Sequence, residues 1–531
     1  MFSLRRVVKY SVVAGAITGT AISLSKNQYD VDAIGIVRLG RAASTVFRIA
    51  LDYKKALYAK NIDPGSPEYI TLRSQVHKAA AEKLLNLCCT NKGVYIKVGQ
   101  HIGALDYLVP KEYVDTMKVL HSHAPSSKLE EIYKVLREDL KEDPLKIFAS
   151  IEPEPIGTAS LAQVHKARLI DGTTVAVKVQ HPSVRGNSRV DMKTMEILVS
   201  LVSWAFPEFK FQWLTEETKR NIPIELDFTQ EGHNAEKVKR LFKDTTWLKV
   251  PAIYWDLTTQ RVLTMEFVEG GQVNDLEYIQ SNKINPYEVS SKLGRLYSQM
   301  IFVEGFVHSD PHPGNIFVRK NSNNEVEIVL LDHGLYATLS NDVRCEYSKL
   351  WLSIFNMDKK GMRQHCEKLG VGDLYGLFAC MVTGRTWDAL MTGIDKTKFS
   401  VKEKALFQKE IPGLLPQISD VLARVNRQIL LILKTNDLMR GIEHTLKTET
   451  QMTSFRVMSR CCIESVYKER LRECKTSLSR YQTLFQKHLE LFRLNVYYVL
   501  LNLRSLNVLI ISMICKVFPA RQSCIVEKSV N

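Results

Sequence analysis

One short stretch, His308-Ser309-Asp310-Pro311-His312-Pro313-Gly314-Asn315, restricts the possible folds of this chain more than any other. It places an aspartate five positions before an asparagine on a tight turn that contains prolines. Seventeen residues after Asn315, directly behind the apolar run 328–331, a second aspartate follows in Asp332-His333-Gly334. Two carboxylates and an amide in this order can surround one phosphate group, with the amide and the second carboxylate binding a metal ion. The sequence therefore predicts a site for phosphate chemistry.

The order of elements around this stretch indicates a protein with two lobes. Strands are expected over 163–170, 173–180, 248–254 and 261–267, and helices over 186–206 and 216–241. Asp171-Gly172 between the first two strands is a strong signal for a two-residue hairpin turn. From about residue 286 the pattern becomes mostly helical. We therefore expect an α+β, bilobal protein-kinase-like fold, with a small lobe over 151–271 and a large lobe over 272–485.

Lys178 lies in Val175-Ala176-Val177-Lys178-Val179, a pattern that resembles the third-strand lysine of kinases. Strand alternation turns Ala176 and Lys178 to the same face, where a nucleotide would lie. An ammonium group there can bridge two phosphates if a carboxylate holds it in place. A lysine on the surface of an edge strand would give the same short pattern. Because Asp310 and Asn315 occur at the expected separations, the combination predicts that ATP binds here with Mg²⁺.

The residues before the sheet are expected to form an α-helical extension over 31–150. Helical periodicity covers 31–60, resumes at about Thr71 and returns over 127–150. Asn91-Lys92-Gly93 predicts a break within this extension, because glycine and asparagine favour turns. Anything sheet-like should therefore begin only after residue 150.

Both ends of the chain raise the question of a membrane. Residues 1–30 carry three basic residues within the first nine positions and no acid before Asp30. Such a start is typical of a mitochondrial presequence, with or without retention as a membrane anchor; a secretory signal is the alternative. The tail 486–531 is strongly apolar, but Arg504 near its middle favours an interfacial or docked helix over a full span. A buried last helix of the large lobe is an equal alternative.

Composition restricts the class of partner. The net charge of +15 favours an anionic partner such as a phosphate ligand, an acidic membrane surface or nucleic acid. Nucleic acid is disfavoured, because no Lys/Arg run is interleaved with aromatic residues as a nucleic-acid groove requires. The ten cysteines match no zinc or redox spacing, so we expect reduced thiols. The oligomeric state is left open.

Several motifs together resemble the UbiB (aarF-domain-containing) atypical kinase family. The stretch 308–315 is similar to the family's catalytic loop, and Lys97-Val98-Gly99-Gln100 is similar to its KxGQ element. Glu225-Leu226-Asp227 is similar to the ExD element, and 155–165 resembles the alanine-rich nucleotide loop. These motifs extend over roughly residues 80 to 340. With the basic N-terminus and Asp332-His333-Gly334, the chain resembles the mitochondrial aarF-domain-containing kinase group of animals.

The resemblance implies a role for each matched residue. Lys178 would pair with Glu231 and hold the phosphates, and Asp310 would face the acceptor hydroxyl. Asn315 and Asp332 would bind Mg²⁺. Lys97 and Gln100 would form an occluding, regulatory element, in which Lys97 meets the carboxylate of Glu225 or Asp227. The nucleotide itself would be bound by a larger group of residues: Gly157, Thr158, Ala159, Ser160, Ala176, Lys178, Glu231, Met265, Glu266 and Val268.

Some features depart from ordinary protein kinases. The phosphate loop lacks G-x-G-x-x-G and keeps a single glycine in Gly157-Thr158-Ala159-Ser160, so we expect a stiffer loop. His333 replaces the usual phenylalanine, and Ser309 rather than arginine precedes Asp310. Without that arginine, loop phosphorylation has no evident charge partner, which disfavours a protein substrate. We expect His308 to support the metal-binding turn and His312 to shape the loop rather than to contact phosphate.

The resulting hypothesis is a Mg²⁺-dependent atypical kinase or ATPase that supports lipid or isoprenoid homeostasis at a mitochondrial membrane. Its substrate would be a membrane or lipid-related molecule. The alternative is a catalytically weak pseudokinase scaffold that binds nucleotide and a mitochondrial membrane protein. A small-molecule phosphotransferase would have the same order of histidine, aspartate and asparagine in its loop, but the KxGQ and ExD elements disfavour this class. The phosphate acceptor itself is not encoded in any motif.

Overall fold

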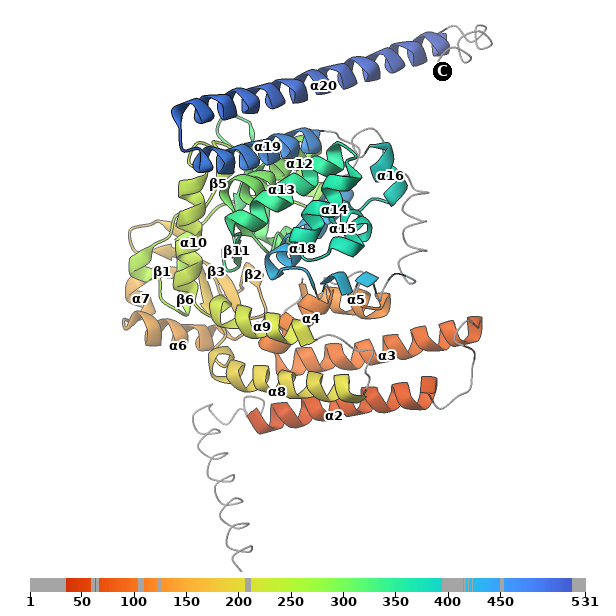
Figure 1. The fold of residues 1–531 in the computed structure, drawn as a ribbon. Coiled ribbons are helices and arrows are strands. Elements are labelled where there is room, and N and C mark those ends of the chain that lie inside the picture. The colour runs from red at the N-terminus through yellow and green to blue at the C-terminus, as the bar shows by residue number, and fades with distance from the viewer. Residues whose placement is uncertain are drawn as a thin grey trace, which may run out of the picture.

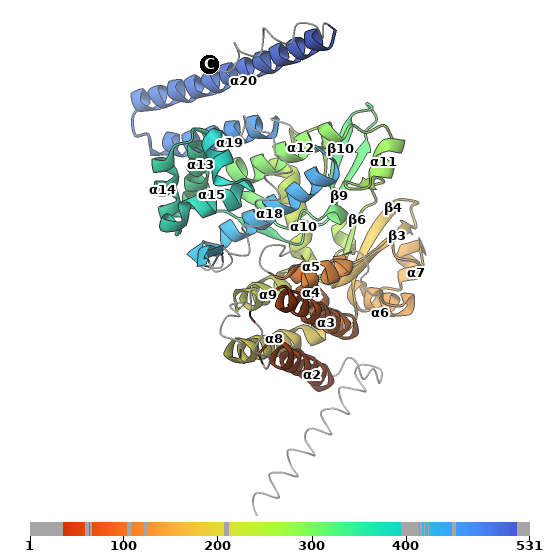
Figure 2. The same ribbon diagram turned by 90° about the vertical axis from the view of Figure 1, so that its right-hand side faces the viewer.

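The structure is a computed structural model of one chain. It describes residues 35–58, 63, 66–103, 109–121, 126–205, 212–393, 424–448 and 453–517, together with 414, 417, 418 and 420–422. Side chains of 501–517 are not part of the description. The N-terminal expectation for 1–30 lies outside the described residues. Figures 1 and 2 show a layer of N-terminal helices below a two-lobed body, with one long helix above it.

The N-terminal layer is helical, as expected. Its elements are α2 (Gly35–Tyr53), η2 (Lys54–Tyr58), α3 (Pro67–Asn91), α4 (Val94–Gly103), α5 (Lys111–Met117) and η3 (Lys118–His121). Helix α3 begins earlier than expected because the Ser66 hydroxyl caps it, accepting the Tyr69 N–H at 3.1 Å. The expected break is confirmed, because Lys92 (φ 55°) and Gly93 (φ 57°) turn the chain between α3 and α4.

The small lobe is built on a five-stranded antiparallel sheet. Its strands are β1 (Phe148–Ile151), β2 (Gly157–Thr158), β3 (Ala162–Leu169), β4 (Thr174–Gln180) and β6 (Val262–Glu266). The order is β1-β3-β4-β6, with β2 paired to β3. The hairpin between β3 and β4 is confirmed, and Gly172 takes the positive φ of 88° that its turn requires.

The helix expected over 127–150 is only partly correct. Helix α6 (Leu129–Leu140) ends at Lys141 in a left-handed conformation, and α7 (Pro144–Ile147) is a single turn after Asp143. Residues 148–151 are strand β1 instead. The apolar side of α6, including Ile132 and Leu136, packs on the sheet core around Val177. The sheet therefore begins three residues earlier than expected, at Phe148, and is covered by a helix from the region assigned to the extension.

Two further expectations for the small lobe are corrected. The single helix over 216–241 is two helices, α9 (Gln212–Glu225) and α10 (Phe228–Leu241), while α8 (Val184–Ala205) agrees with its predicted range. The strand expected over 248–254 is interrupted. Its first part, β5 (Leu248–Lys249), pairs in parallel with β10 (Val326–Leu330) of the large lobe, whereas Ile253 forms an isolated antiparallel bridge with Met265 on β6. Pro251 has no N–H to continue the ladder, which explains the short strand.

The large lobe is mostly helical. Its elements are β7 (Gly271–Gln272), α11 (Leu276–Ser281), α12 (Pro286–Ser298), η5 (Gln299–Glu304), β8 (Phe306–His308), η6 (Pro313–Asn315), β9 (Ile316–Lys320), β10 (Val326–Leu330), β11 (Tyr336–Thr338), α13 (Asn341–Phe355), α14 (Lys359–Lys368), η7 (Gly372–Leu374), α15 (Tyr375–Thr383), α16 (Trp387–Thr392), α18 (Arg427–Thr445) and α19 (Thr453–Glu473); the 3₁₀ turn η4 (Trp255–Leu257) precedes β6. Strands β5-β10-β9-β7 form one sheet and β11-β8 another. Fully buried residues such as Leu293, Ile328 and Leu350 form one core that holds the motif-bearing strands in place.

The chain continues into α20 (Ser477–Val517), a helix of 41 residues that begins well before the expected apolar tail. It packs along α19 through residues such as Tyr498, which is 4% exposed, and stands at the outer edge of the large lobe (Figure 1). Among the residues that the structure describes, no helix combines the length and the apolar character needed to cross a membrane. The eight cysteines whose side chains are described carry no disulfide.

Candidate functional site

The centre of the site is an ion pair between the two lobes. The Lys178 Nζ on β4 lies 2.7 and 2.9 Å from the carboxylate oxygens of Glu231 on α10. It also lies 3.2 Å from Asp332 Oδ2, although burial leaves Lys178 only 8% exposed. Burial opposes the charge, but the carboxylates of Asp332 and Glu231 raise the pKa of Lys178 well above its usual value. The predicted lysine–glutamate pair is therefore formed, and it already reaches the predicted metal ligand.

The turn at Asp332 is held on both sides. The Gly334 N–H donates to Asp332 Oδ1 at 2.8 Å, and His308 Nε2 donates to the Asp332 carbonyl at 2.6 Å. His308 thus supports this turn, as expected. Burial would raise the pKa of Asp332, but the Lys178 ammonium and the Gly334 N–H lower it to about 2. Asp332 is consequently ionised at physiological pH and ready to bind a cation.

His333 stands where ordinary protein kinases have phenylalanine, and its ring forms hydrogen bonds that a phenylalanine could not form. Its Nδ1 accepts from the Tyr336 hydroxyl at 2.9 Å and its Nε2 donates to the Leu330 carbonyl at 3.2 Å. Burial and the nearby His308 lower the pKa of His333 to about 3, so the ring stays neutral. The His333 carbonyl accepts from Asn234 on α10 at 2.9 Å. These bonds join the turn after Asp332 directly to the helix that carries Glu231.

The catalytic loop places Asp310 against a lysine that no motif indicated. Asn315 Nδ2 donates to the Asp310 carbonyl at 3.1 Å, and Lys434 Nζ on α18 lies 3.1 Å from Asp310 Oδ1. His312 accepts the Gly314 N–H at 3.2 Å, which matches the expected structural role in the loop. Burial would raise the pKa of Asp310, but the positive charges of Lys434 and Lys97 hold it far below its usual range.

Three residues of the KxGQ element, Lys97, Gly99 and Gln100, have different structural roles. Lys97 Nζ on α4 pairs with Glu225 Oε2 at 2.8 Å. A Cβ on Gly99 would run into the end of the Leu120 side chain, so the close approach of α4 to η3 favours glycine here and a larger residue would force Leu120 to move. Gln100 Nε2 donates to the Leu120 carbonyl at 3.0 Å and so ties α4 to η3. Gln100 therefore positions the element, while Lys97 is the part that reaches the site.

Lys97 lies close enough to Asp310 and Asp332 for their charges to act on it. Burial opposes its charge, but Glu225, Asp310 and Asp332 together raise the pKa of Lys97 well above its usual value. Of the two carboxylates considered for Lys97, Glu225 is the partner. Asp227 instead caps α10, where its Oδ1 accepts the Thr229 N–H at 3.1 Å. This cap is also the reason that the predicted helix over 216–241 breaks in two.

The nucleotide loop is a tight, supported turn. Gly157 and Thr158 form β2 against β3, and the Ala159 N–H closes the turn onto the Ala162 carbonyl at 2.8 Å. Ser160 is buried, and His181 Nε2 lies 3.2 Å from the Ala159 carbonyl. A Cβ on Gly157 would meet nothing within 4 Å. The contacts around the turn agree with the expectation of a stiff loop.

The link between the lobes follows β6. Ala176 and Met265 face each other across paired strands and are both largely buried, as the walls of an adenine site would be. Glu266 turns its carboxylate away to Lys249 Nζ at 2.6 Å and donates its N–H to Ala252 at 2.8 Å. The Glu266 side chain and N–H are therefore already engaged, and the predicted contact of this segment with adenine through backbone groups stays a prediction.

The residues present have the chemistry that Mg²⁺ requires. Four carboxylates (Glu225, Glu231, Asp310 and Asp332) face three ammonium groups (Lys97, Lys178 and Lys434), which leaves one negative charge in excess. The Asn315 amide nitrogen is held by Asp310, so Oδ1 is the atom left for a cation. Glu225 Oε1 is buried without a hydrogen-bond partner in the described part of the chain. Hard oxygen donors that leave room for phosphates and water suit this ion.

The predicted charged residues thus come together from separate parts of the chain, and Lys434 joins them unexpectedly. Lys434 is 124 positions from Asp310 and lies in the middle of a helix that carries no motif. A lysine in such a helix carries no local signal, because its function depends on how α18 packs against the loop. Lys97, by contrast, was recognisable from its short motif.

Known proteins with similar sequences were found along almost the whole chain. The ABC1 atypical kinase-like domain matches residues 119–366. AarF domain-containing kinase 1 of Drosophila melanogaster is 59% identical over 94% of this chain and 97% of its own length. AarF domain-containing protein kinase 1 of Mus musculus is 48% identical over 94% and 95%. The solved complex of Rv3197 with erythromycin from Mycobacterium tuberculosis aligns with a TM-score of 0.45 and 19% identity, over 72% of this chain and 95% of that one.

Proposed function

The chain belongs to the ABC1/AarF atypical kinase-like family, and from this premise we propose that it binds a magnesium–nucleotide complex and transfers or hydrolyses the terminal phosphate. The observation that carries the proposal is the contact of Lys178 with both Glu231 and Asp332. A protein that had lost phosphate chemistry would have no need to keep this arrangement beside Asn315 and Asp310. The relatives' names agree with the coarser statement of a kinase-like protein.

In this proposal each residue has a positional or electrostatic role. Lys178 holds the phosphates while Glu231 holds Lys178. Asp332 and Asn315 would hold Mg²⁺, which would supply positive charge next to the phosphate oxygens. Asp310 remains ionised because of Lys434, so it orients an acceptor hydroxyl or a water molecule rather than removing its proton early. A loose transition state for phosphoryl transfer requires little more than such positioning.

A direct test is ATP turnover by the purified full-length protein with and without Mg²⁺. We expect Asp332→Asn and Asp310→Asn each to lower turnover by about 10²-fold or more, because the charges that act on the transition state are lost. Both changes keep the shape of the side chain. Lys239→Ala, an exposed lysine on α10, is the control and should behave as the wild type. Unchanged turnover in both aspartate variants would rule out the enzyme.

The scaffold remains the second candidate because of one observation. Asp310, which would face the acceptor, is already paired with Lys434, and Lys97 of the helical extension pairs with Glu225 close by. If Mg²⁺-ATP binds but is not turned over, and the Asp332→Asn variant still restores function to cells that lack the protein, the scaffold is favoured. Failure of Asp332→Asn to restore function, at normal abundance, favours the enzyme.

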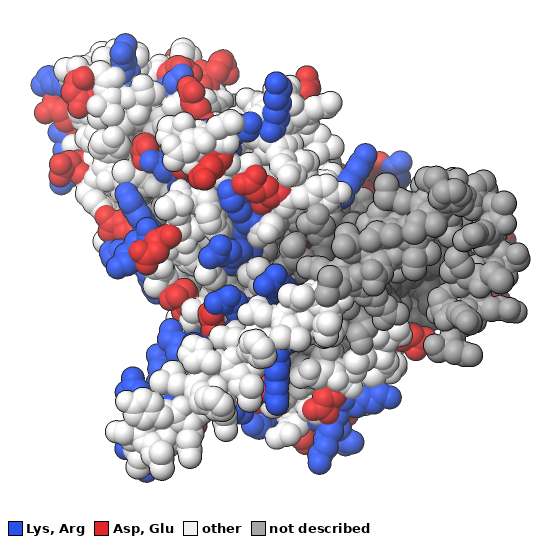
Figure 3. Space-filling model, turned by 90° about the horizontal axis from the view of Figure 1, so that it is seen from above, with Lys and Arg blue, Asp and Glu red and all other residues white. Residues whose placement is uncertain are grey.

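We further propose action on a lipid-related substrate at a mitochondrial membrane. The support comes from the N-terminal sequence and from a stripe of exposed apolar residues on α20, which recur every three or four positions. These are Leu478, Tyr481, Phe485, Leu489, Phe492, Val496 and Val499, with Leu500 beside the last. Figure 3 shows the face of the molecule on which α20 lies, where uncharged surface alternates with Lys, Arg, Asp and Glu. An amphipathic helix with basic flanks is suited to the surface of an anionic membrane.

The membrane proposal can be tested by vesicle flotation. Full-length protein should float with vesicles that contain an anionic lipid, and the double variant Phe485→Asp/Phe492→Asp should bind at least tenfold more weakly. Both phenylalanines are more than 60% exposed, so the change should leave the fold intact. Gln486→Asp adds a charge beside the stripe and should bind as the wild type. Equal flotation of the double variant would remove α20 from the proposal.

A further inference from the structure

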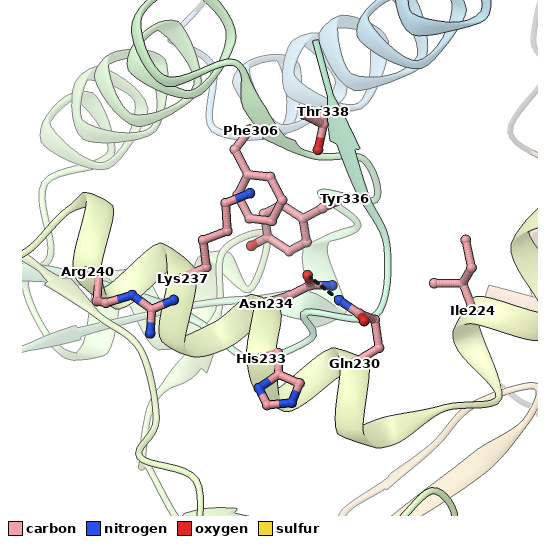
Figure 4. A pocket seen from close by; sticks show the side chains of 9 residues that line it. All are labelled: Ile224, Gln230, His233, Asn234, Lys237, Arg240, Phe306, Tyr336 and Thr338. Carbon is pink, nitrogen blue, oxygen red and sulfur yellow. Dashed lines mark hydrogen bonds between the residues drawn. The ribbon is translucent and has the colours of Figure 1, made fainter. Parts of the chain in front are cut away.

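A cavity of about 540 Å³ lies on the far side of α10 from Lys178. Its walls are α10, the strand pair β8 and β11, and Ile224 at the end of α9 (Figure 4). Glu231 and the cavity-lining residues Lys237 and Arg240 leave α10 in different directions, because a helix turns by about 100° per residue. The cavity is therefore separate from the phosphate site, although the same helix forms a wall of both.

The cavity is lined by basic groups and by no acid. Lys237, Arg240 and His233 line it, and none of the other lining residues is an aspartate or glutamate. In the part of the chain that the structure describes, no carboxylate lies within ion-pair distance of Lys237. Its ammonium lies 3.7 Å from the centre of the Phe306 ring. Arg240 reaches Glu236 only at 3.9 Å, and that carboxylate accepts the Trp255 N–H at 2.7 Å.

The opposite wall is aromatic. Phe306 and Tyr336 stack with ring centres 4.4 Å apart, and Lys237 lies against this stack in Figure 4. Phe306 is only 5% exposed, because Tyr336 and Lys237 cover it, so a ligand would meet the two cations rather than the rings. Two neighbouring cations suit a doubly charged group, and a phosphate monoester is one, since its charge at neutral pH is close to two and its oxygens accept several hydrogen bonds.

The cavity is joined to the phosphate site by short hydrogen bonds. The Tyr336 hydroxyl, in its wall, donates to His333 at 2.9 Å, and Asn234, also in its wall, donates to the His333 carbonyl at 2.9 Å. His333 follows Asp332, and α10 carries Glu231 on another face. A ligand that connects Lys237 with the Tyr336 side of the cavity would therefore connect both elements that form the phosphate site.

We propose that this cavity binds a phosphate monoester and that its occupancy strengthens nucleotide binding by holding α10 against the Asp332 turn. This goes beyond the proposed function, since the cavity is a second binding site with its own ligand. The binding itself does not depend on catalysis. A failure of ATP turnover would consequently leave the first experiment below unaffected.

The first experiment measures binding of phenyl phosphate to the full-length protein by calorimetry, in the presence of saturating Mg²⁺-ATP. The wild type and Lys239→Ala should bind it equally, whereas Lys237→Ala and Arg240→Ala should each bind at least tenfold more weakly. Phenol, which lacks the phosphate, should not bind. The proposal is overturned if phenyl phosphate does not bind, if Mg²⁺-ATP displaces it fully, or if neither variant weakens it.

A second measurement distinguishes a free phosphate ester from a lipid headgroup and tests the coupling. If the natural ligand is a lipid headgroup, vesicles of phosphatidylcholine with phosphatidic acid should recruit the wild type more strongly than the double variant Lys237→Ala/Arg240→Ala. Equal recruitment of the two proteins would assign the site to a soluble ester. Phenyl phosphate should also tighten Mg²⁺-ATP binding several-fold in the wild type but not in this double variant. No change in the wild type would refute the coupling.

Discussion

Replacing Lys434 by alanine should lower ATP turnover by about 10²-fold without unfolding the protein, because a preorganised positive charge beside the transferred phosphate is lost. Lys434 lies 3.1 Å from Asp310 and is only partly buried, with 24% of its side chain exposed. Its removal should therefore change the charge of the site far more than the packing of α18. ATP turnover of the purified variant measures the effect on the site, and its thermal unfolding measures the effect on packing.

The pH dependence separates an electrostatic role of Lys434 from a structural one. In the wild type, Lys434 and Lys97 keep the pKa of Asp310 far below its usual range, so Asp310 stays ionised throughout the working range. Without Lys434 this pKa should rise, and turnover of Lys434→Ala should fall further as the pH is lowered. Lys434→Arg keeps the charge and should retain most of the activity. An alanine variant with wild-type turnover would show that Lys434 has no part in the reaction.

Replacing Asp191 by alanine should destabilise the N-terminal helical layer by about 3–5 kcal/mol, the usual cost of leaving one member of a buried ion pair alone. Asp191 on α8 accepts two hydrogen bonds from Arg38 on α2, at 2.8 and 2.6 Å. The two residues are 1% and 4% exposed. Without Asp191 the guanidinium would lose this partner while remaining buried. Chemical unfolding, together with hydrogen exchange of α2 and α8, measures the loss.

Two controls accompany this stability prediction. Asp115→Ala removes the partner of Lys111 in an exposed pair on α5 and should cost less than about 1 kcal/mol. The double variant Arg38→Met/Asp191→Met replaces the buried pair with apolar side chains and should recover most of the stability. If Asp191→Ala is no more destabilising than Asp115→Ala, the buried pair does not hold α2 in place.

The expectations that were confirmed rest on short-range patterns. The hairpin at Asp171-Gly172 follows from two residues, because few others tolerate that turn. The Lys178 strand and the 308–315 loop are recognisable because each motif needs its own residues in a fixed local order. The family assignment has the same basis and is confirmed by the matched domain and relatives.

The expectations that failed depended on contacts between distant residues. Periodicity continued across Leu226 and Asp227, so one helix was expected where the Asp227 cap ends one and starts another. The 248–254 strand was expected to be continuous in the small lobe, but its first two residues pair with β10, which is eighty positions further along the chain, and only Ile253 bridges to β6 of the small lobe. Residues 148–151 have a helical pattern, yet pairing with β3 makes them a strand. A local pattern does not specify which distant strand is available for pairing.

The sequence by itself determined the fold class, the family and the set of charged residues that meet between the lobes, because these depend on motifs of a few residues with fixed spacing. The tertiary structure alone decided that Lys97 pairs with Glu225 rather than Asp227, and that Lys434 forms an ion pair with Asp310. It also placed a basic cavity behind α10. Each of these features depends on how helices that are far apart in the chain pack together. The energy of such contacts depends on the distance between the groups and on their burial in the folded state. The spacing of residues in a short motif does not specify either quantity.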